Sequence, residues 1–240
     1  INRNLQTMKT LIHLFEDCVK KYADNVYLLE KRNNKYSGAT YGEVKEKVYQ
    51  FGAGLIEIGI KKGDRIALLA EGRNDWVICE IGIFYAGAVN IPLSIKLTEP
   101  SEIIFRLKHS GARFVITTKN QAKKVNPVFK EIETLEKIIL LDPKESYDSH
   151  EIYYGDLLKS GKEFLKTHAD AFAERWNSLA SADLANICYT SGTTADPKGI
   201  ILTHGNYVRK VYQSYCVMDI PSLYKTLLIL PWDHSFGHTC

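Results

Sequence analysis

Residues 188–199 read Cys188-Tyr189-Thr190-Ser191-Gly192-Thr193-Thr194-Ala195-Asp196-Pro197-Lys198-Gly199. The apolar run 184–189 leads into this stretch, and the β-branched pair Ile200-Ile201 that follows suits a strand. Glycine and small hydroxyl residues let backbone N–H groups approach an anion closely, and the hydroxyls donate further hydrogen bonds. Lys198 adds a compact positive charge that suits phosphate oxygens. The pattern therefore predicts a strand–loop–strand unit whose loop binds an anion.

Two other interpretations of this stretch need to be weighed. Ser, Thr, Gly, Asp and Pro are ordinary turn residues, so a plain polar turn between two strands is the simplest alternative. A Walker A loop needs Gly-Lys followed by Ser or Thr at the start of a helix. Here Pro197-Lys198-Gly199 precedes a strand-like pair, so the sequence excludes the Walker A loop.

Composition narrows the class of protein. The chain has 240 residues, which fits one large domain or two small ones, with 45% hydrophobic and 25% charged residues. The net charge of +3 is too small to indicate a nucleic-acid partner. The five cysteines are scattered without a CxxC pair, which is typical of reduced cytoplasmic thiols. There is no apolar run of the length of a transmembrane segment and no secretory signal.

Helix and strand signals alternate along most of the chain. Strands are expected at 26–31, 36–40, 65–70, 88–91, 114–118, 137–141, 184–189 and 200–202. Helices are expected at 11–22, behind the capping box Thr40/Glu43 up to Gly59, at 74–85, from Pro100 up to Gly111, and at 121–132. Residues 142–150 read as a surface loop, with helices expected in 153–165, 171–179 and after Thr203.

This alternation predicts an α/β fold with a mostly parallel sheet and helices on both faces. Such sheets bind ligands beyond the carboxyl ends of their strands. The loop that follows Thr190 lies at such a strand end.

The order Thr-Ser-Gly-Thr-Thr-x-x-Pro-Lys-Gly resembles the phosphate loop of the adenylate-forming enzymes: acyl-CoA synthetases, luciferases and the adenylation domains of peptide synthetases. The match runs from Tyr189 to Gly199, with Ala195 where the family usually has Gly, and continues through 202–206. Other segments are similar to the amino-terminal part of acyl-CoA synthetases, especially the long-chain fatty-acid type. They are Gly63–Ala67, Trp76, Gly82–Pro92, Ser110–Arg113, Leu230-Pro231 and His234–Phe236.

The resemblance implies an AMP-forming acid–thiol ligase that uses ATP, Mg²⁺ and coenzyme A. A carboxylic acid, expected to be a fatty acid from the long-chain type of relative, attacks the α-phosphate of ATP to give an acyl-adenylate and pyrophosphate. A thiol, normally that of coenzyme A, then takes the acyl group. A fatty-acid substrate also leaves open a peripheral contact of the protein with a membrane.

The resemblance also assigns roles to residues. Lys198 would neutralise phosphate charge, and His234 would lie near the acyl pocket and the adenylate. The β- and γ-phosphates would be held by Thr190, Ser191, Gly192, Thr193 and Thr194. His204 is expected to be structural, because Thr203 to Asn206 reads as a helix cap. His234, His238 and Cys240 match no familiar zinc spacing, so no metal ligands are predicted.

Several motifs of the family have no counterpart in the sequence. They are the Thr-x-Glu magnesium site, the aspartate on the ribose, the hinge and the mobile lysine. We therefore expect residues 1–240 to be the amino-terminal part of an adenylation domain that is inactive alone, and we assign no catalytic residue within it. A non-catalytic nucleotide-binding or scaffold module and an amino-acid-activating domain that loads a carrier protein remain alternatives.

Overall fold

The computed structural model describes residues 9–190, 197–218, 221, 224–228 and 230–233. Its helices are α1 (Leu11–Tyr22), α2 (Tyr41–Glu57), α3 (Asn74–Tyr85), α4 (Pro100–Ser110), α5 (Lys119–Val125), α6 (Tyr154–Asn177) and α7 (His204–Val217). Its strands are β1 (Val26–Arg32), β2 (Lys35–Thr40), β3 (Arg65–Leu69), β4 (Val89–Pro92), β5 (Phe114–Thr117), β6 (Lys137–Leu140), β7 (Glu151–Tyr153), β8 (Leu184–Thr190) and β9 (Lys198–Thr203).

Strands β3 to β9 form one sheet in the order β7-β6-β5-β3-β4-β8-β9, while β1 and β2 form a separate hairpin. All neighbours in the larger sheet pair in parallel except β8 and β9, which are antiparallel. The prediction of a mostly parallel sheet is therefore confirmed. The pairing of β8 with β4 is confined to one register pair, Asn90 with Asn186.

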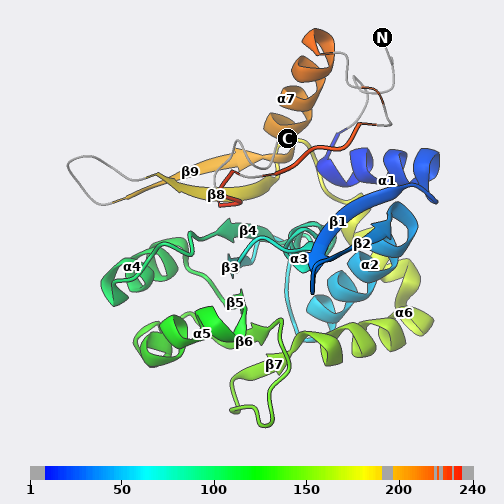
Figure 1. Ribbon diagram of the computed structural model, residues 1–240. Helices are drawn as coiled ribbons and strands as arrows, with labels where there is room; N and C mark the ends of the chain where they lie inside the picture. The colour runs from blue at the N-terminus through cyan, green and yellow to red at the C-terminus, as the bar shows by residue number, and fades with distance from the viewer. Residues whose placement is uncertain (1–8, 191–196, 219–220, 222–223, 229, 234–240) are drawn as a thin grey trace.

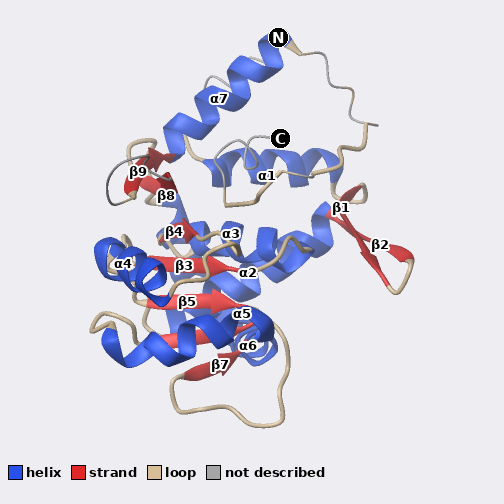
Figure 2. Ribbon diagram, turned by 60° about the vertical axis from the view of Figure 1, so that its left-hand side comes forward, coloured by secondary structure: helices blue, strands red, loops and turns tan. Residues whose placement is uncertain are grey.

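Helices cover both faces of the sheet, as Figures 1 and 2 show. On one face α1, α2, α3 and α6 enclose a core that includes Phe51, Tyr85 and Phe172. On the other face α4 and α5 enclose a second core around Leu107 and Val125. The crossover after β3 therefore passes over one face and the crossovers after β4 and β5 over the other.

Local sequence signals set most helix ends. Thr40 and Glu43 form the predicted capping box at the start of α2, with both reciprocal hydrogen bonds present. Gly111 ends α4 with φ of 62°, a left-handed conformation that favours glycine. Helices α1 and α3 begin and end at the predicted residues.

Three predictions differ from the structure. The expected helix at 121–132 ends at Val125 and continues as a 3-10 helix (Asn126–Glu131), because Pro127 has no N–H and clashes with the preceding turn. Strand β7 was not predicted. The two helices expected in 153–179 are one element, α6, with non-helical backbone at His168.

Strand β9 forms the end of the sheet and is poorly covered. Ile200 is 43% exposed and its neighbour Ile201 is 58% exposed. Because successive side chains of a strand point to opposite faces, these two exposed side chains leave both faces of the sheet open at this end, as far as the structure describes the chain.

Candidate phosphate-binding site

The predicted phosphate loop joins the two strands of the β8–β9 hairpin. Tyr189 pairs with Gly199 and Thr190 pairs with Lys198, so the antiparallel ladder continues to the base of the loop. Thr190 and Lys198 are both exposed. The other predicted phosphate ligands, Ser191, Gly192, Thr193 and Thr194, lie outside the described residues. The hairpin thus brings together the two ends of the predicted site.

The hairpin places the two ends of this loop at the edge of the sheet where the sequence pattern predicts a ligand. Strand β8 runs parallel to β4, so Thr190 stands at its carboxyl end. This is the edge at which parallel α/β sheets bind ligands.

A buried polar network fixes β8 against its neighbours. Asn186, which is 1% exposed, donates from Nδ2 to Glu80 Oε1 at 3.1 Å and to Tyr207 Oη at 2.8 Å. The amide of Asn90 on β4 donates to the same Glu80 oxygen at 2.8 Å. These bonds connect α3, β4, β8 and α7. Because buried amides left without partners are costly, the network favours one position for β8.

The cysteine at the start of the phosphate-loop motif is not a reactive thiol. Cys188 is 6% exposed. Burial, with a smaller effect of the Glu80 carboxylate, raises the pKa of its thiol to about 12. A thiol held in the protonated form is a poor nucleophile. Cys188 therefore packs in the core as a protonated thiol.

His204 is structural, as predicted. Thr203 caps α7, and the side chains and backbone of Thr203 and Asn206 exchange the two bonds of a capping box. The imidazole of His204 is 1% exposed and lies edge-on to Phe84, with ring centroids 5.3 Å apart. Burial lowers its pKa to about 4, so it stays neutral at physiological pH.

The segment just before the predicted pocket histidine is anchored to the sheet, although His234 itself lies outside the described residues. The indole of Trp232 lies edge-on to Trp76, with centroids 5.4 Å apart. It also covers Gly72, where an added Cβ atom would stand only 2.9 Å from the indole. Gly72 follows β3, so Trp232 reaches the carboxyl ends of the parallel strands. The contact joins residues 160 positions apart, and nothing in the sequence pattern marks it.

Glu71, a polar residue at the carboxyl ends of the parallel strands, was also not identified from the sequence. Glu71, just after β3, accepts hydrogen bonds from Thr118 Oγ1 at 2.7 Å and from Gln121 Nε2 at 2.6 Å. Burial acts against ionisation here, but these bonds outweigh it and lower the pKa of Glu71. The crossovers after β3 and β5 leave on opposite faces, so this network fills the point where the chain reverses its winding.

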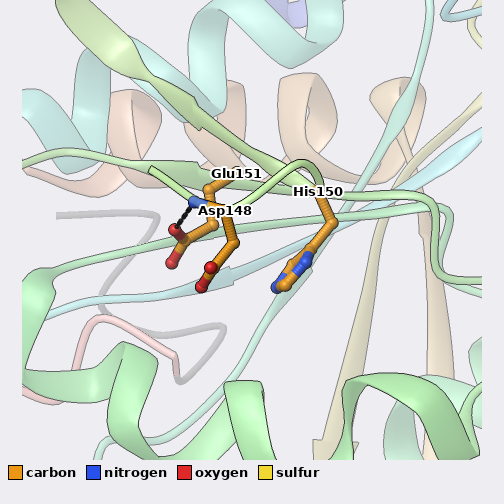
Figure 3. A group of neighbouring side chains, drawn as sticks. All are labelled: Asp148, His150 and Glu151. Carbon is orange, nitrogen blue, oxygen red and sulfur yellow. Dashed lines mark hydrogen bonds between the residues drawn. The ribbon is translucent and has the colours of Figure 1, made fainter. Parts of the chain in front are cut away.

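One cluster, Asp148, His150 and Glu151, has the donor types of a metal site. Its ligand atoms lie within 4.8 Å of one another (Figure 3). The Glu151 carboxylate, however, already forms an ion pair with Lys144 and accepts from the backbone N–H of Asp148 at 2.7 Å. A bound cation would have to displace that ammonium group. The cluster therefore fits a local ion pair and turn better than a metal site.

Among the described residues, no helix combines the length and the apolar character needed to cross a membrane.

Comparison with known proteins identifies the family to which the chain belongs. The family described as "AMP-binding enzyme" matches residues 15–240. A long-chain-fatty-acid–[acyl-carrier-protein] ligase, AEE15 of Arabidopsis thaliana, is 26% identical over 95% of this chain and 33% of its own length. Surfactin synthase subunit 1 of Bacillus subtilis is 30% identical over 86% of this chain and 5% of its own length. The chain thus spans about a third or less of these two relatives.

Solved structures agree on the fold. The long-chain-fatty-acid-CoA ligase FadD1 of Archaeoglobus fulgidus has a TM-score of 0.78 at 16% identity, over 96% of this chain and 43% of that one. The N-terminal domain of FACL13 from Mycobacterium tuberculosis has a TM-score of 0.74 at 23% identity, over 97% of this chain and 54% of that one. The chain therefore belongs to the AMP-binding enzyme family and has the fold of the amino-terminal domain of the adenylate-forming enzymes.

Proposed function

We propose that the protein takes part in the ATP-dependent activation of a carboxylic acid, a fatty acid first of all, to an acyl-adenylate. One observation carries the proposal. The β8–β9 hairpin sets Thr190 and Lys198 opposite each other at the base of a Ser/Gly/Thr-rich loop at the carboxyl end of a strand. Membership of the AMP-binding family and the names of its fatty-acid-activating relatives support the same reaction.

The residues of the loop have the chemistry that this step needs. A carboxylate oxygen forms a bond to the α-phosphorus, the bond from that phosphorus to the bridging oxygen breaks, and pyrophosphate leaves with the electron pair. Backbone N–H groups and the hydroxyls of Thr190, Ser191, Thr193 and Thr194 would hold the β- and γ-phosphates. Lys198, which is exposed, would neutralise charge on the leaving pyrophosphate.

The proposal assigns no metal ligand within residues 1–240. The Thr-x-Glu triplet in the sequence, Thr134-Leu135-Glu136, precedes β6, and its glutamate is paired with Arg113. The Asp148 cluster does not fit a cation either. Mg²⁺ bound to ATP would supply further charge neutralisation when present. We propose that residues 1–240 are the amino-terminal part of an adenylation domain, which binds ATP weakly by itself and is inactive alone.

The acceptor of the acyl group divides the proposal into two candidates. Coenzyme A is the acceptor in the first, since several relatives carry acyl-CoA ligase or synthetase in their names. An acyl carrier protein is the acceptor in the second, which the name of the AEE15 relative favours. Both share the adenylation step at the loop.

Pyrophosphate–ATP exchange by the full-length gene product tests the adenylation step, with a panel of fatty, aromatic and amino acids. Exchange that depends on a fatty acid is the expected result. Exchange that depends only on an amino acid would replace the substrate class, and no exchange from a folded protein would favour a non-catalytic nucleotide-binding module. Thioester formation measured in parallel with coenzyme A and with holo-acyl carrier protein separates the two acceptors.

A further inference from the structure

The side chain of Tyr189 joins helix α4 to the base of the phosphate loop by hydrogen bonds. The Tyr189 hydroxyl donates to the main-chain oxygen of Arg106 at 3.2 Å and lies 2.8 Å from Nδ1 of His109. A phenol has one hydrogen to donate and lone pairs to accept. With its hydrogen directed to the Arg106 oxygen, it accepts from the Nδ1–H tautomer of His109. The hydroxyl thus joins two residues of α4 to the strand that enters the loop.

The aromatic ring of Tyr189 is held as well as its hydroxyl. The guanidinium carbon of Arg106 lies 5.7 Å from the ring centroid, and the His109 ring meets it edge-on at 5.8 Å. Arg106 is 7% exposed, and its Nη1 donates to the main-chain oxygen of Glu102 at 2.8 Å. Phe105 stacks on His109 at 5.4 Å. The surface that receives Tyr189 is therefore fixed by contacts within α4.

The same surface reaches the other strand of the hairpin. Gly199 pairs with Tyr189, and a Cβ atom placed on Gly199 would stand 3.6 Å from both the Tyr189 ring and the His109 ring. It would also stand 3.0 Å from the side chain of Ile187, which is closer than most real contacts. Both strands at the base of the loop thus lie against the carboxyl-terminal turn of α4.

This contact matters because strand pairing does not hold the loop end of the hairpin. The register pairing of β8 with β4 is confined to Asn186. Tyr189 is three residues further on, or about 10 Å along the strand. Within the described residues, the Tyr189 contact is the polar link between that end of the hairpin and the α/β body. Loops that position phosphates need support to within a fraction of an ångström.

We propose that Tyr189 and His109, with Arg106, are positioning residues that hold the base of the phosphate-binding loop against helix α4. The role rests on the proposed adenylation reaction, although the contact itself can be tested without it. None of the three touches the reacting atoms. Their loss alters the placement of Thr190 and Lys198, and hence the apparent affinity for ATP, with little effect on the affinity for the carboxylic acid.

The first arm of the experiment measures amide hydrogen exchange of residues 190–199 in the full-length protein. Tyr189→Phe keeps the ring and removes both hydrogen bonds, and His109→Ala removes one at an exposed position where folding is not at risk. Both are expected to accelerate exchange in this segment about fivefold or more, with α2 and α3 unchanged. His109→Asn and His109→Gln make a matched pair. An Asn amide reaches about as far as Nδ1 and restores the donor, whereas a Gln amide reaches toward the Nε2 position and does not.

The second arm measures pyrophosphate–ATP exchange by the same variants, with Tyr36→Phe in the remote β1–β2 hairpin as the control. We expect the KM for ATP to rise about five- to tenfold for Tyr189→Phe and His109→Ala, with the KM for the acid unchanged. The double variant should be no worse than the more affected single variant, because the two residues share one contact.

The outcomes separate the two proposals. Unchanged amide exchange in residues 190–199 of Tyr189→Phe would overturn the positioning role. Equal rises in the KM for ATP and the KM for the acid, together with a lowered thermal midpoint, would overturn it as well. Faster amide exchange in a protein whose wild type lacks all pyrophosphate–ATP exchange would overturn the proposed function and leave the contact between α4 and the loop established.

Discussion

A very close approach between two helix backbones gives the sharpest prediction. Helices α2 and α6 cross with Gly161 of α6 placed directly on α2. A Cβ atom at position 161 would stand 1.8 Å from the main-chain oxygen of Gln50 and 2.6 Å from the amide nitrogen of Gly54. Both are backbone atoms of a helix, so no side-chain rotation relieves the overlap. Gly161→Ala therefore forces the two helices apart.

The cost follows from the size of the overlap. Ordinary contact begins near 3.4 Å, so the helices have to separate by about 1.6 Å along this line. Overpacking of this kind costs about 1–3 kcal/mol and more where backbone moves, while alanine regains about 1 kcal/mol of helix propensity. Because the same crossing buries Leu157 and Phe172, we expect a net loss of about 2–4 kcal/mol in the free energy of unfolding.

Urea denaturation followed by circular dichroism measures this loss. The midpoint should fall with little change in the slope, and the thermal midpoint should fall by about 5–15 °C. Gly42→Ala is the matched control, since Gly42 is also helical and a Cβ atom there would stand 3.3 Å from its nearest neighbour. Equal stability of Gly161→Ala and wild type would refute the placement of α6 on α2.

Four further predictions concern the core and the site. Hydrogen bonds from Lys45 and two tyrosines outweigh burial and lower the pKa of Glu16 from 4.5, so its contribution to stability is present above 4.5 and is lost as the pH falls through the folded-state pKa. Glu16→Gln should therefore flatten the decline of the urea midpoint below about pH 4.5, and an unchanged pH dependence would contradict the assignment. Tyr85→Phe removes the hydroxyl that donates to Glu16 and should lower the free energy of unfolding in urea by about 1–2 kcal/mol. An unchanged free energy of unfolding would show that the bond is not formed. Thr203→Ala removes the cap of α7 and should destabilise that helix by about 1 kcal/mol, which would appear as faster amide exchange in the first turn of α7 alone. Faster amide exchange over the whole sheet would contradict this local role. Lys198→Ala should raise the KM for ATP in pyrophosphate–ATP exchange by about tenfold or more without lowering the thermal midpoint, and an unchanged KM would remove Lys198 from the phosphate site.

The elements set by local chemistry could be predicted from the sequence. The capping box at Thr40, the left-handed glycine at Gly111 and the apolar helix 74–85 each depend on residues a few positions apart. The alternation of strands and helices likewise indicated the parallel sheet. Pro127 shortened one helix for a reason visible in the sequence, but the continuation as a 3-10 turn depends on the packing of Val128 in the second core.

Features that depend on distant pairs were missed. Tyr189 was noted as part of a motif, but its bonds to α4 depend on the face that β8 presents, which single-strand patterns do not give. The network of Asn186, Glu80 and Asn90 likewise needs the strand order before any of its members can be paired. For the phosphate loop itself, the sequence motif says more than the described residues, which give its two ends and the strands that support them.

The uncovered end of the sheet at β9 has a consequence for handling the protein. In the described part of the chain β9 is the outermost strand of the sheet and has isoleucine on both faces, and such a strand is a template onto which another extended segment can add. Natural edge strands are usually protected by charges, bulges or proline, and between Lys198 and Thr203 the sequence places only Gly, Ile, Ile and Leu. Polypeptides that present this strand bare are therefore expected to associate with one another as their concentration rises, and the solubility of a preparation depends on what covers Ile200 and Ile201.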